Sequence, residues 1–209
     1  MFITNPDVER YIEELTRLQI FDENVLREME DYGEKVNFPI VGRQVGVFLY
    51  LMAKLKKPKL VVEMGSGYGY SAYWFAKGME SGKVVLTDFQ DRNISKAKEY
   101  FKRVGLEDRA EFRVGDAVEI AKEYGGIDIL FLDLEKVRYL DAIKIIENNL
   151  SEGSLVLADN VLWRGEVLKD YPDKKTTVIK EFNQYMFGSG KFVSQIVPIR
   201  DGVLLSIKL

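Results

Sequence analysis

Residues 59–71 read KLVVEMGSGYGYS, and this stretch decides the fold. A short apolar run ends at Glu63, glycines follow at every second position, and an apolar segment resumes at Tyr70. We expect a strand, a tight turn and a helix, because glycine permits turns that other residues resist and lets a ligand lie against bare backbone. A plain glycine-rich connection between a strand and a helix is the alternative.

Short apolar runs rich in Val, Ile and Leu recur along the chain, and helical patterns separate them. The expected strands cover residues 59–63, 83–87, 110–114, 127–132 and 154–158. The expected helices between them cover residues 70–79, 91–104, 116–124 and 135–149. Strands that alternate with helices predict a parallel sheet with helices on both faces.

The chain ahead of the first strand departs from this alternation. Asn5 and Pro6 are typical of a helix start, and Asp22 is placed to cap a second helix. A third helix is expected over residues 41–55, where apolar residues on almost every side indicate burial. We expect the helices of residues 5–56 to form a cap, a dimer element or a substrate-side element.

The C-terminal end also departs from the alternation. After a helix expected near residues 174–187, two apolar runs are joined by Arg200, Asp201 and Gly202, which is a hairpin signal. The last strands should therefore pair antiparallel. The whole pattern predicts one α/β domain over residues 1–209, with a seven-stranded, mostly parallel sheet and an antiparallel C-terminal strand.

The composition is that of a globular protein. The chain has 209 residues, of which 46% are hydrophobic and 30% charged, enough for one sizeable domain. No apolar run approaches the length of a membrane span, and the N-terminal stretch turns acidic at once, unlike a signal peptide. We therefore expect a soluble, cytoplasmic protein without a membrane partner. A net charge of −3 argues against a dedicated nucleic-acid binder.

The chain contains neither cysteine nor histidine. The absence of cysteine excludes disulfides, a thiolate nucleophile and a zinc ribbon. The absence of histidine excludes a Ser-His-Asp triad and an imidazole metal ligand. Any metal must therefore be held by oxygen, and any general base must be Lys, Asp, Glu or Tyr.

Acidic residues recur where the predicted strands end. The first five strands end at or just before Glu63, Asp88, Asp116, Asp133 and Asp159. Some of these acids could cap helices, but ligands of open parallel sheets bind outside the carboxyl ends of the strands. The repetition therefore favours a binding site along this edge.

The glycine stretch has the form E-x-G-x-G-x-G and resembles the first motif of S-adenosylmethionine-dependent methyltransferases of the Rossmann-like class. Tyr70 stands where a dinucleotide-binding motif has its third glycine, which disfavours a nicotinamide oxidoreductase. In the methyltransferase interpretation Asp88 accepts the ribose hydroxyls, and Asp116 with Ala117 lies near adenine. A helix N-cap remains the alternative for both aspartates.

The fourth and fifth strands deliver a second group of polar side chains. Residues 131–136 read FLDLEK and residues 157–160 read LADN, so Asp133, Asp159 and Asn160 should converge. Two carboxylates and an amide oxygen suit Mg²⁺ first, with Mn²⁺ or Ca²⁺ as alternatives. Two adjacent substrate hydroxyls could fill the open positions of such a cation. A simple turn remains the alternative for the Asp-Asn pair.

Over residues 36–209 the chain resembles the cation-dependent O-methyltransferases related to catechol and caffeoyl-coenzyme A O-methyltransferase. The stretches that carry the resemblance are VVEMGSGYGYSA, FLDLEKVRYL, LVLADNVLWRGEV and PIRDGVLL. The resemblance implies a Rossmann-like class I methyltransferase fold, with Asp133, Asp159 and Asn160 as metal ligands. It implies Lys136 as the catalytic base beside Asp133. The implied cofactor contacts are Val41, Gly42, Glu63, Gly65, Ser66, Gly67, Tyr68, Ser71, Asp88, Phe89, Asp116, Ala117 and Asp133.

The expected substrate contacts are Phe38, Pro39, Lys136 and Trp163. Tyr171 is a further candidate for the aromatic wall, although core packing would explain such aromatics equally well. A solvated surface lysine is the alternative for Lys136, whose pKa a neighbouring cation could depress enough for it to serve as base.

The chain departs from the animal catechol enzymes at Leu134 and Glu135, where those enzymes carry bulky aromatic or imidazole groups. The cofactor and substrate walls should therefore differ, and a small catechol need not be the substrate. Glu135 would disfavour acidic acceptors if it pointed inward.

These observations predict an S-adenosylmethionine-dependent, divalent-metal-dependent O-methyltransferase. Its acceptor would be a small vicinal-dihydroxy aromatic, catechol-like or of the hydroxycinnamoyl type, and the protein would be a homodimer. One alternative is methylation of a hydroxyuridine in tRNA, for which the basic residues are Lys54, Lys56, Lys57 and Lys59. Another is a protein that binds the cofactor without turnover.

Overall fold

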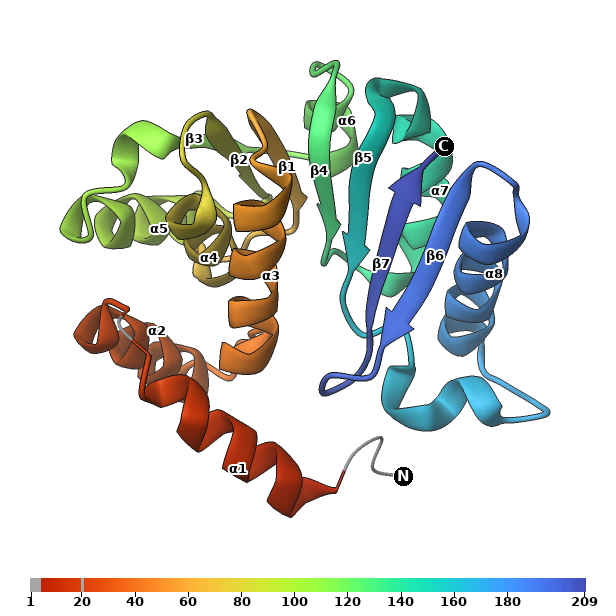
Figure 1. Ribbon diagram of the computed structural model, residues 1–209, viewed down its shortest axis with the longest axis horizontal. Helices are drawn as coiled ribbons and strands as arrows, with labels where there is room; N and C mark the ends of the chain where they lie inside the picture. The colour runs from red at the N-terminus through yellow and green to blue at the C-terminus, as the bar shows by residue number, and fades with distance from the viewer. Residues whose placement is uncertain (1–4, 20) are drawn as a thin grey trace.

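Seven strands form one mixed sheet in the order β3-β2-β1-β4-β5-β7-β6 (Figure 1). Their bounds are β1 Leu60–Met64, β2 Lys83–Asp88, β3 Ala110–Val114, β4 Ile127–Leu132, β5 Leu150–Ala158, β6 Phe192–Val197 and β7 Val203–Lys208. β1 to β5 pair in parallel, and β7 runs antiparallel to both of its neighbours. The predicted sheet is therefore confirmed.

This computed structural model describes residues 5–19 and 21–209. Residues 1–4, the start of the stretch that argued against a signal peptide, lie outside the described part. Helices longer than one turn are α1 Pro6–Arg17, α2 Glu23–Lys35, α3 Gly42–Lys56, α4 Tyr70–Gly78, α5 Asp91–Arg103, α6 Ala117–Ala121, α7 Tyr139–Ile146 and α8 Lys174–Gly188. Four 3₁₀ segments are η1 Glu107–Arg109, η2 Lys136–Arg138, η3 Glu147–Asn149 and η4 Trp163–Leu168.

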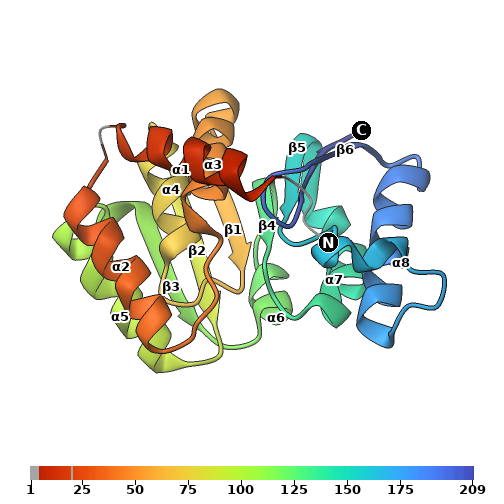
Figure 2. The ribbon, with the colours of Figure 1, turned by 90° about the horizontal axis from the view of Figure 1, so that it is seen from below.

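The parallel strands bury both of their faces, because successive side chains point to opposite sides of the sheet. Val61 and Phe131 pack into the core beneath α2, α3, α4 and α5. Val62 and Leu130, their neighbours in sequence, pack into the core beneath α6, α7 and α8. The helices therefore cover both faces, as predicted, and Figure 2 shows the two layers from below.

Three predicted boundaries differ in the structure. β5 starts at Leu150, not at residue 154, because an irregularity in its register with β4 lets the polar stretch before Ser154 join the strand. α6 spans less than the predicted 116–124. The helix predicted over 135–149 is instead the series η2, α7 and η3.

The sequence predicts a side-chain cap at the start of both α1 and α2, but only α1 has one in the structure. The side chain of Asn5 accepts a hydrogen bond from Asp7 N at 2.8 Å, as expected of a cap. Asp22 holds the N-cap position of α2, but its carboxylate bonds Tyr73 and Lys77 of α4 instead of the helix backbone. α3 is buried on one side only, since Leu55 is 76% exposed.

Arg43 fixes the N-terminal helices beside the glycine turn. Its guanidinium is almost fully buried and pairs with Glu23 at 2.5 Å and Glu30 at 2.7 Å, both on α2. Glu30 also accepts a hydrogen bond from Tyr70 at the start of α4, at 2.7 Å. A buried guanidinium needs such partners, so this network holds α2 and α3 against the start of α4, next to the turn after β1.

In Figure 1 the carboxyl ends of β4 and β5 point toward the lower edge of the view, where α1, η4 and the β6–β7 turn also lie. Neighbours β1 and β4 mark the point where the order of the strands reverses, the usual place for a ligand in such a sheet. No helix in the described part of the chain is long and apolar enough to cross a membrane.

Candidate active site

The carboxyl ends of β1, β4 and β5 border a cavity of about 1160 Å³. Most of the predicted site residues lie on its wall: Phe38, Pro39, Val41, Gly65, Ser66, Gly67, Tyr68, Ser71, Asp88, Phe89, Ala117, Asp133, Lys136, Asp159, Asn160 and Trp163. The fold thus brings together residues that are more than 120 positions apart in the chain.

The glycine turn approaches the end of β4 at backbone distance. Gly65 has φ +91°, and a Cβ at this position would lie 2.6 Å from the carbonyl oxygen of Asp133. The amide of Asp133 in turn donates to the carbonyl of Met64 at 2.9 Å. Only glycine fits this close approach, which places the turn beside the carboxylate of Asp133.

Three predicted cofactor residues do not line the cavity: Gly42, Glu63 and Asp116. Gly42 follows the wall residue Val41, and the guanidinium of Arg200 fills the space over it. Asp116 bonds the amides of Val118 and Glu119, so it is the N-cap of α6.

Arg138 also bonds the carboxylate of Asp116. Its guanidinium contacts both carboxylate oxygens of Asp116, at 3.0 and 2.7 Å. The N-cap alternative for Asp116 is therefore confirmed, and Ala117 alone of that pair reaches the wall.

Asp88 behaves differently from Asp116. Its Oδ1 accepts hydrogen bonds from Gln90 N at 2.7 Å and from the side chain of Asn93 at 3.1 Å. The N-cap of α5 is Gln90, so Asp88 does not cap that helix, and its side chain stays on the cavity wall.

Glu63 is a fully buried carboxyl group beneath the cavity. Neither of its oxygens has a hydrogen-bond partner in the described protein. Burial raises the pKa of Glu63 to about 8, although the neighbouring hydroxyls of Ser66 and Ser71 oppose the rise. Ser66 and Ser71, which neighbour Glu63, do line the cavity, whereas Glu63 itself does not.

Lys136 stands between Asp133 and Tyr139. Its ammonium lies 2.8 Å from Oδ1 of Asp133 and 2.7 Å from the hydroxyl of Tyr139. The 3₁₀ turn of η2 explains the second contact, because side chains three residues apart align in that geometry. Tyr139 donates onward to the carbonyls of Leu132 and Asp159, so it joins the ends of β4 and β5.

The electrostatic environment of Lys136 raises the pKa of its ammonium group. Burial alone would lower it, but the phenol oxygen of Tyr139 and the carboxylate of Asp133 outweigh that effect. The side chain is only 12% exposed, so the alternative of a solvated surface lysine is wrong. A general base needs a lowered pKa, and these protein contacts alone do not lower the pKa of Lys136.

Asp159 is the second carboxylate at this edge, and it is 4% exposed. Its Oδ1 is buried without a hydrogen-bond partner among the described residues. Burial and the nearby charge of Asp133 raise the pKa of Asp159 to about 7. Asn160 follows with φ +60°, which turns the chain sharply after the strand. Two repelling acids and an orphaned carboxylate oxygen therefore lie together at this edge of the sheet.

The aromatic wall is smaller than predicted. Phe38, Pro39 and Trp163 line the cavity, and the ring of Phe38 packs edge-on against Tyr68 at 5.3 Å. Tyr171 is 96% exposed and lies outside the cavity, so its inclusion was wrong. It follows η4 in an exposed stretch of the chain, so its ring faces solvent.

Several wall residues were not predicted: Glu9, Arg138, Arg164, Lys175, Arg200 and Asp201. Arg200 and Asp201 were predicted only as a turn. The sequence did hold a signal for them. The turn follows β6, which runs parallel to β5, so it must lie at the same edge of the sheet as the end of β5. Glu135 is exposed at the mouth beside these basic residues, so the rim carries both signs of charge.

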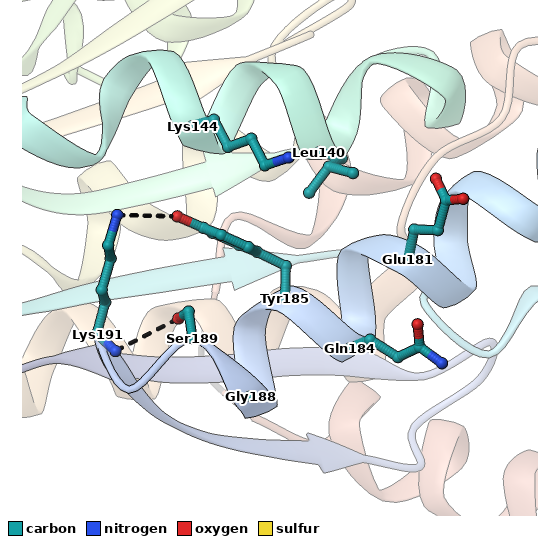
Figure 3. A pocket seen from close by; sticks show the side chains of 8 residues that line it. All are labelled: Leu140, Lys144, Glu181, Gln184, Tyr185, Gly188, Ser189 and Lys191. Carbon is teal, nitrogen blue, oxygen red and sulfur yellow. Dashed lines mark hydrogen bonds between the residues drawn. The ribbon is translucent and has the colours of Figure 1, made fainter.

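A second hollow lies between α7 and α8 (Figure 3). Lys144 and Lys191 stand over the ring of Tyr185, at 5.4 and 5.8 Å from its centroid. Lys191 also pairs with Glu147 at 2.5 Å. These polar groups satisfy one another, and none of the predicted site residues lies here.

A family model described as O-methyltransferase matches residues 17–209. The chain belongs to the O-methyltransferase family. The matched part of this O-methyltransferase includes every predicted site residue. It is therefore an enzyme of the methyltransferase class, and its Rossmann-like architecture is that of its solved relatives.

Relatives of this O-methyltransferase carry names from both predicted branches. A catechol O-methyltransferase of Niastella koreensis is 28% identical over 78% of this chain and 79% of its own. Caffeoyl-CoA O-methyltransferase 2 of Populus trichocarpa is 29% identical over 77% and 71%. The crystal structure of a methyltransferase from Geobacter sulfurreducens superposes with a TM-score of 0.85 at 33% identity, over 99% of this chain and all of its own.

Proposed function

We propose that this enzyme transfers the methyl group of S-adenosylmethionine to one hydroxyl of a vicinal-dihydroxy aromatic acceptor. One observation carries the proposal. The glycine turn, Asp133 and Lys136 meet at one end of the cavity, with Gly65 in backbone contact with Asp133. Methyl transfer from a sulfonium is an in-line displacement, so donor and acceptor must be held end to end, and this cavity has room for both.

The donor would lie along the turn after β1. Ser66, Ser71 and Asp88 supply hydroxyl and carboxylate oxygens on that side of the cavity. Phe89 is 64% exposed beside Asp88 and offers an open apolar face for a purine. The arrangement supports the cofactor assignment derived from the glycine motif.

A divalent cation would fit between Asp133, Asp159 and Asn160. No group of three or more Asp, Glu, His or Cys side chains arranged for a metal occurs in the described residues, and the proposed set has only two carboxylates. The fit rests on the buried, unpartnered Oδ1 of Asp159 and on the repulsion between the two acids. Such oxygen ligands favour Mg²⁺, with Mn²⁺ or Ca²⁺ as alternatives. When bound, the cation would lower the pKa of an acceptor hydroxyl.

Lys136 is the proposed base that takes the acceptor proton. Its nitrogen lies at the cavity wall, within 2.8 Å of a proposed metal ligand. In its present environment the ammonium is favoured, because Asp133 and Tyr139 both stabilise the charge. A positive charge placed on Asp133 and Asp159 would oppose that stabilisation and favour the neutral amine.

The acceptor would lie between Trp163, Phe38 and Pro39. The names of the two relatives indicate catechol and caffeoyl-coenzyme A as acceptor types, and both carry adjacent ring hydroxyls. The mixed charge of the rim does not support the expected exclusion of acidic acceptors. Glu135 is exposed and is accompanied by Arg164, Lys175 and Arg200.

The tRNA alternative depended on the basic residues around the end of α3. Lys54 and Lys57 pair with Glu80, at 3.7 and 3.5 Å, and Lys59 bonds Ser81. This group precedes β1 and so lies at the amino edge of the sheet, opposite the cavity. A substrate held there would not present its hydroxyl to Lys136.

The homodimer also stays a proposal. α1 and its C-cap residue leave five apolar side chains between 39% and 78% exposed: Val8, Tyr11, Ile12, Leu15 and the C-cap Leu18. A second copy that covered them would remove this area from water. Light scattering during size exclusion would test the state, with a mass near 48 kDa expected for a dimer, twice the 24.0 kDa of the chain.

Binding of S-adenosylhomocysteine, measured by isothermal titration calorimetry, tests the cofactor site. We expect one site per chain, and substitution of Asp88 by alanine should weaken binding by about 10-fold or more. Absence of binding to the wild-type protein would remove the proposal. Binding without turnover of any dihydroxy aromatic would instead favour the non-catalytic alternative.

A further inference from the structure

The loop that follows β5 has an unusual backbone. Asn160, Trp163 and Arg164 have φ of 60°, 46° and 53°, and Gly165 follows at 79°. Asparagine tolerates this region, but tryptophan and arginine do not, and each such residue costs on the order of 1–3 kcal/mol. Contacts from elsewhere must therefore impose this conformation on residues 160–165.

Three of those contacts come from the β6–β7 turn, Arg200 to Gly202, and the side chain of Asn183 on α8 adds another, to the carbonyl of Val161 at 2.9 Å. The amide of Arg164 donates to Oδ1 of Asp201, and the amide of Leu162 donates to the carbonyl of Asp201 at 3.0 Å. The amide of Val161 donates to the carbonyl of Gly202 at 3.1 Å. Gly202 has φ +82°, and a Cβ there would lie 2.5 Å from Leu162, so the turn sits directly on the loop.

The same turn also touches the cofactor side of the cavity. The guanidinium of Arg200 donates to the carbonyl of Ile40 at 3.0 Å and to that of Val41, just ahead of α3. Arg200 and Asp201 thus bond two segments that lie about 120 residues apart in the chain and that both line the cavity.

The side chain of Asp201 makes the contact at the point of greatest strain. Among the three hydrogen bonds that join the loop to the turn, only the one from the amide of Arg164 is accepted by the carboxylate of Asp201. Loss of this acceptor would leave the backbone contacts to Leu162 and Val161 but release the positive φ of Trp163 and Arg164. Trp163 is a cavity wall residue, and Asn160 precedes it on the same loop.

We propose that Asp201 is a positioning residue for methyl transfer, which holds loop 160–165 so that Asn160 and Trp163 face the acceptor, and that Arg200 couples this loop to the cofactor side. The assignment of the acceptor side rests on the proposed function. The position of the loop itself does not.

The tryptophans allow a direct test, because the chain has two and they differ in burial. Trp74 is fully buried, whereas Trp163 is partly exposed, so acrylamide quenching reports mainly on Trp163. A Trp163→Phe variant measures the share of Trp74. We compare the wild-type protein with Asp201→Ala, Asp201→Asn and Asp170→Ala, the last being an exposed acid on the next loop.

For Asp201→Ala we expect the quenching constant of Trp163 to rise about two-fold or more, because the loop is released. Asp201→Asn keeps an oxygen acceptor and should quench like the wild type, as should Asp170→Ala. Equal quenching in Asp201→Ala and the wild type would overturn the positioning role. So would an Asp201→Asn variant that quenches like Asp201→Ala while it melts at the wild-type temperature.

Arg200→Ala tests the coupling and remains informative if Asp201→Ala does not fold. We expect S-adenosylhomocysteine to reduce the quenching of Trp163 in the wild type and to lose this effect in Arg200→Ala, at saturating ligand. An undiminished effect in Arg200→Ala would overturn the coupling. If the wild type binds no S-adenosylhomocysteine, the proposed function fails, while the ligand-free comparison still decides the role of Asp201.

Discussion

The ammonium of Lys136 lies 2.8 Å from Oδ1 of Asp133, in a side-chain pair that is only 12% and 23% exposed. The two residues are three positions apart, and the turn between them leaves β4 at the switch point of the sheet. In the proposed reaction Lys136 accepts the proton of the acceptor, and Asp133 is the ion-pair partner of Lys136. The pair explains why a lysine can remain buried here without a cost that unfolds the site.

Replacement of Lys136 by alanine should lower kcat/KM by about 10²- to 10⁴-fold, the usual contribution of a general base. The affinity for S-adenosylhomocysteine should change less than about three-fold, since the donor lies along the glycine turn. Lys122→Ala, at an exposed lysine that pairs with Glu119, is the control. Steady-state kinetics with calorimetry on the same preparations measure both, and an active Lys136→Ala enzyme would exclude the proposed base.

Replacement of Asp159 by alanine should weaken Mn²⁺ binding by about 10-fold or more, because one of two carboxylate ligands is lost. Electron paramagnetic resonance of free Mn²⁺ gives the affinity without any need for turnover. Asp108→Ala removes an exposed acid near the opposite edge of the sheet and should bind Mn²⁺ like the wild type. Equal affinities for all three proteins would refute the cation site.

Glu63 should make stability depend on pH. Its pKa is about 8 in the fold against 4.5 ordinarily, so between these values the folded state binds more protons than the unfolded state. Stability from this group is therefore lost as the pH rises from about 5 to about 8. Glu63→Gln cannot ionise. The free energy of unfolding of this variant, minus that of the wild type, should therefore increase by a few kcal/mol between about pH 5 and about pH 8.

Urea unfolding at a series of pH values measures that difference, with Glu152→Gln as an exposed control. A difference between Glu63→Gln and the wild type that stays constant from pH 5 to pH 9 would contradict the buried, unpartnered state of Glu63.

Gly65→Ala should damage the site beyond its effect on the backbone. Gly65 and Gly105 both have positive φ, +91° and +67°, but only the first meets other atoms: the carbonyl of Asp133 at 2.6 Å. In Gly105→Ala only the left-handed backbone conformation should cost stability, by roughly 1–2 kcal/mol. Gly65→Ala should unfold at lower urea and bind S-adenosylhomocysteine about 10-fold more weakly, because Asp133 must move. Similar losses in both variants would argue against this close contact.

Local patterns were sufficient to predict most of the fold. Strands buried on both faces appear as continuous apolar runs, and the glycine spacing after residue 63 marks the first turn, so the order of elements follows from short stretches of sequence. The convergence of the acids at the ends of β4 and β5 could be predicted for the same reason. Parallel strands bring their carboxyl ends to one edge, which places Asp133 beside Asp159 without knowledge of side-chain contacts.

Long-range contacts were beyond such patterns. The sequence leaves Asp116 open as a ligand residue or a helix cap, and it does not reveal the pairing of both its carboxylate oxygens with Arg138, 22 positions later. Arg200 reaches Val41, 159 positions earlier, and a turn motif does not reveal that partner. The prediction that Tyr171 lines the cavity was wrong. An aromatic residue joins a cavity wall only if its backbone is held there, and the chain after η4 is exposed.

Product formation with controlled metal tests the central claim most directly. The purified enzyme would be incubated with S-adenosylmethionine and a 3,4-dihydroxycinnamoyl or catechol acceptor, with Mg²⁺ or with excess chelator, and the products measured by mass spectrometry. We expect an acceptor that gains one methyl group with Mg²⁺, and a loss of about 10²-fold or more in rate with chelator or in Asp159→Ala. Methylation that proceeds equally well with chelator and in Asp159→Ala would contradict a cation-assisted transfer at this site.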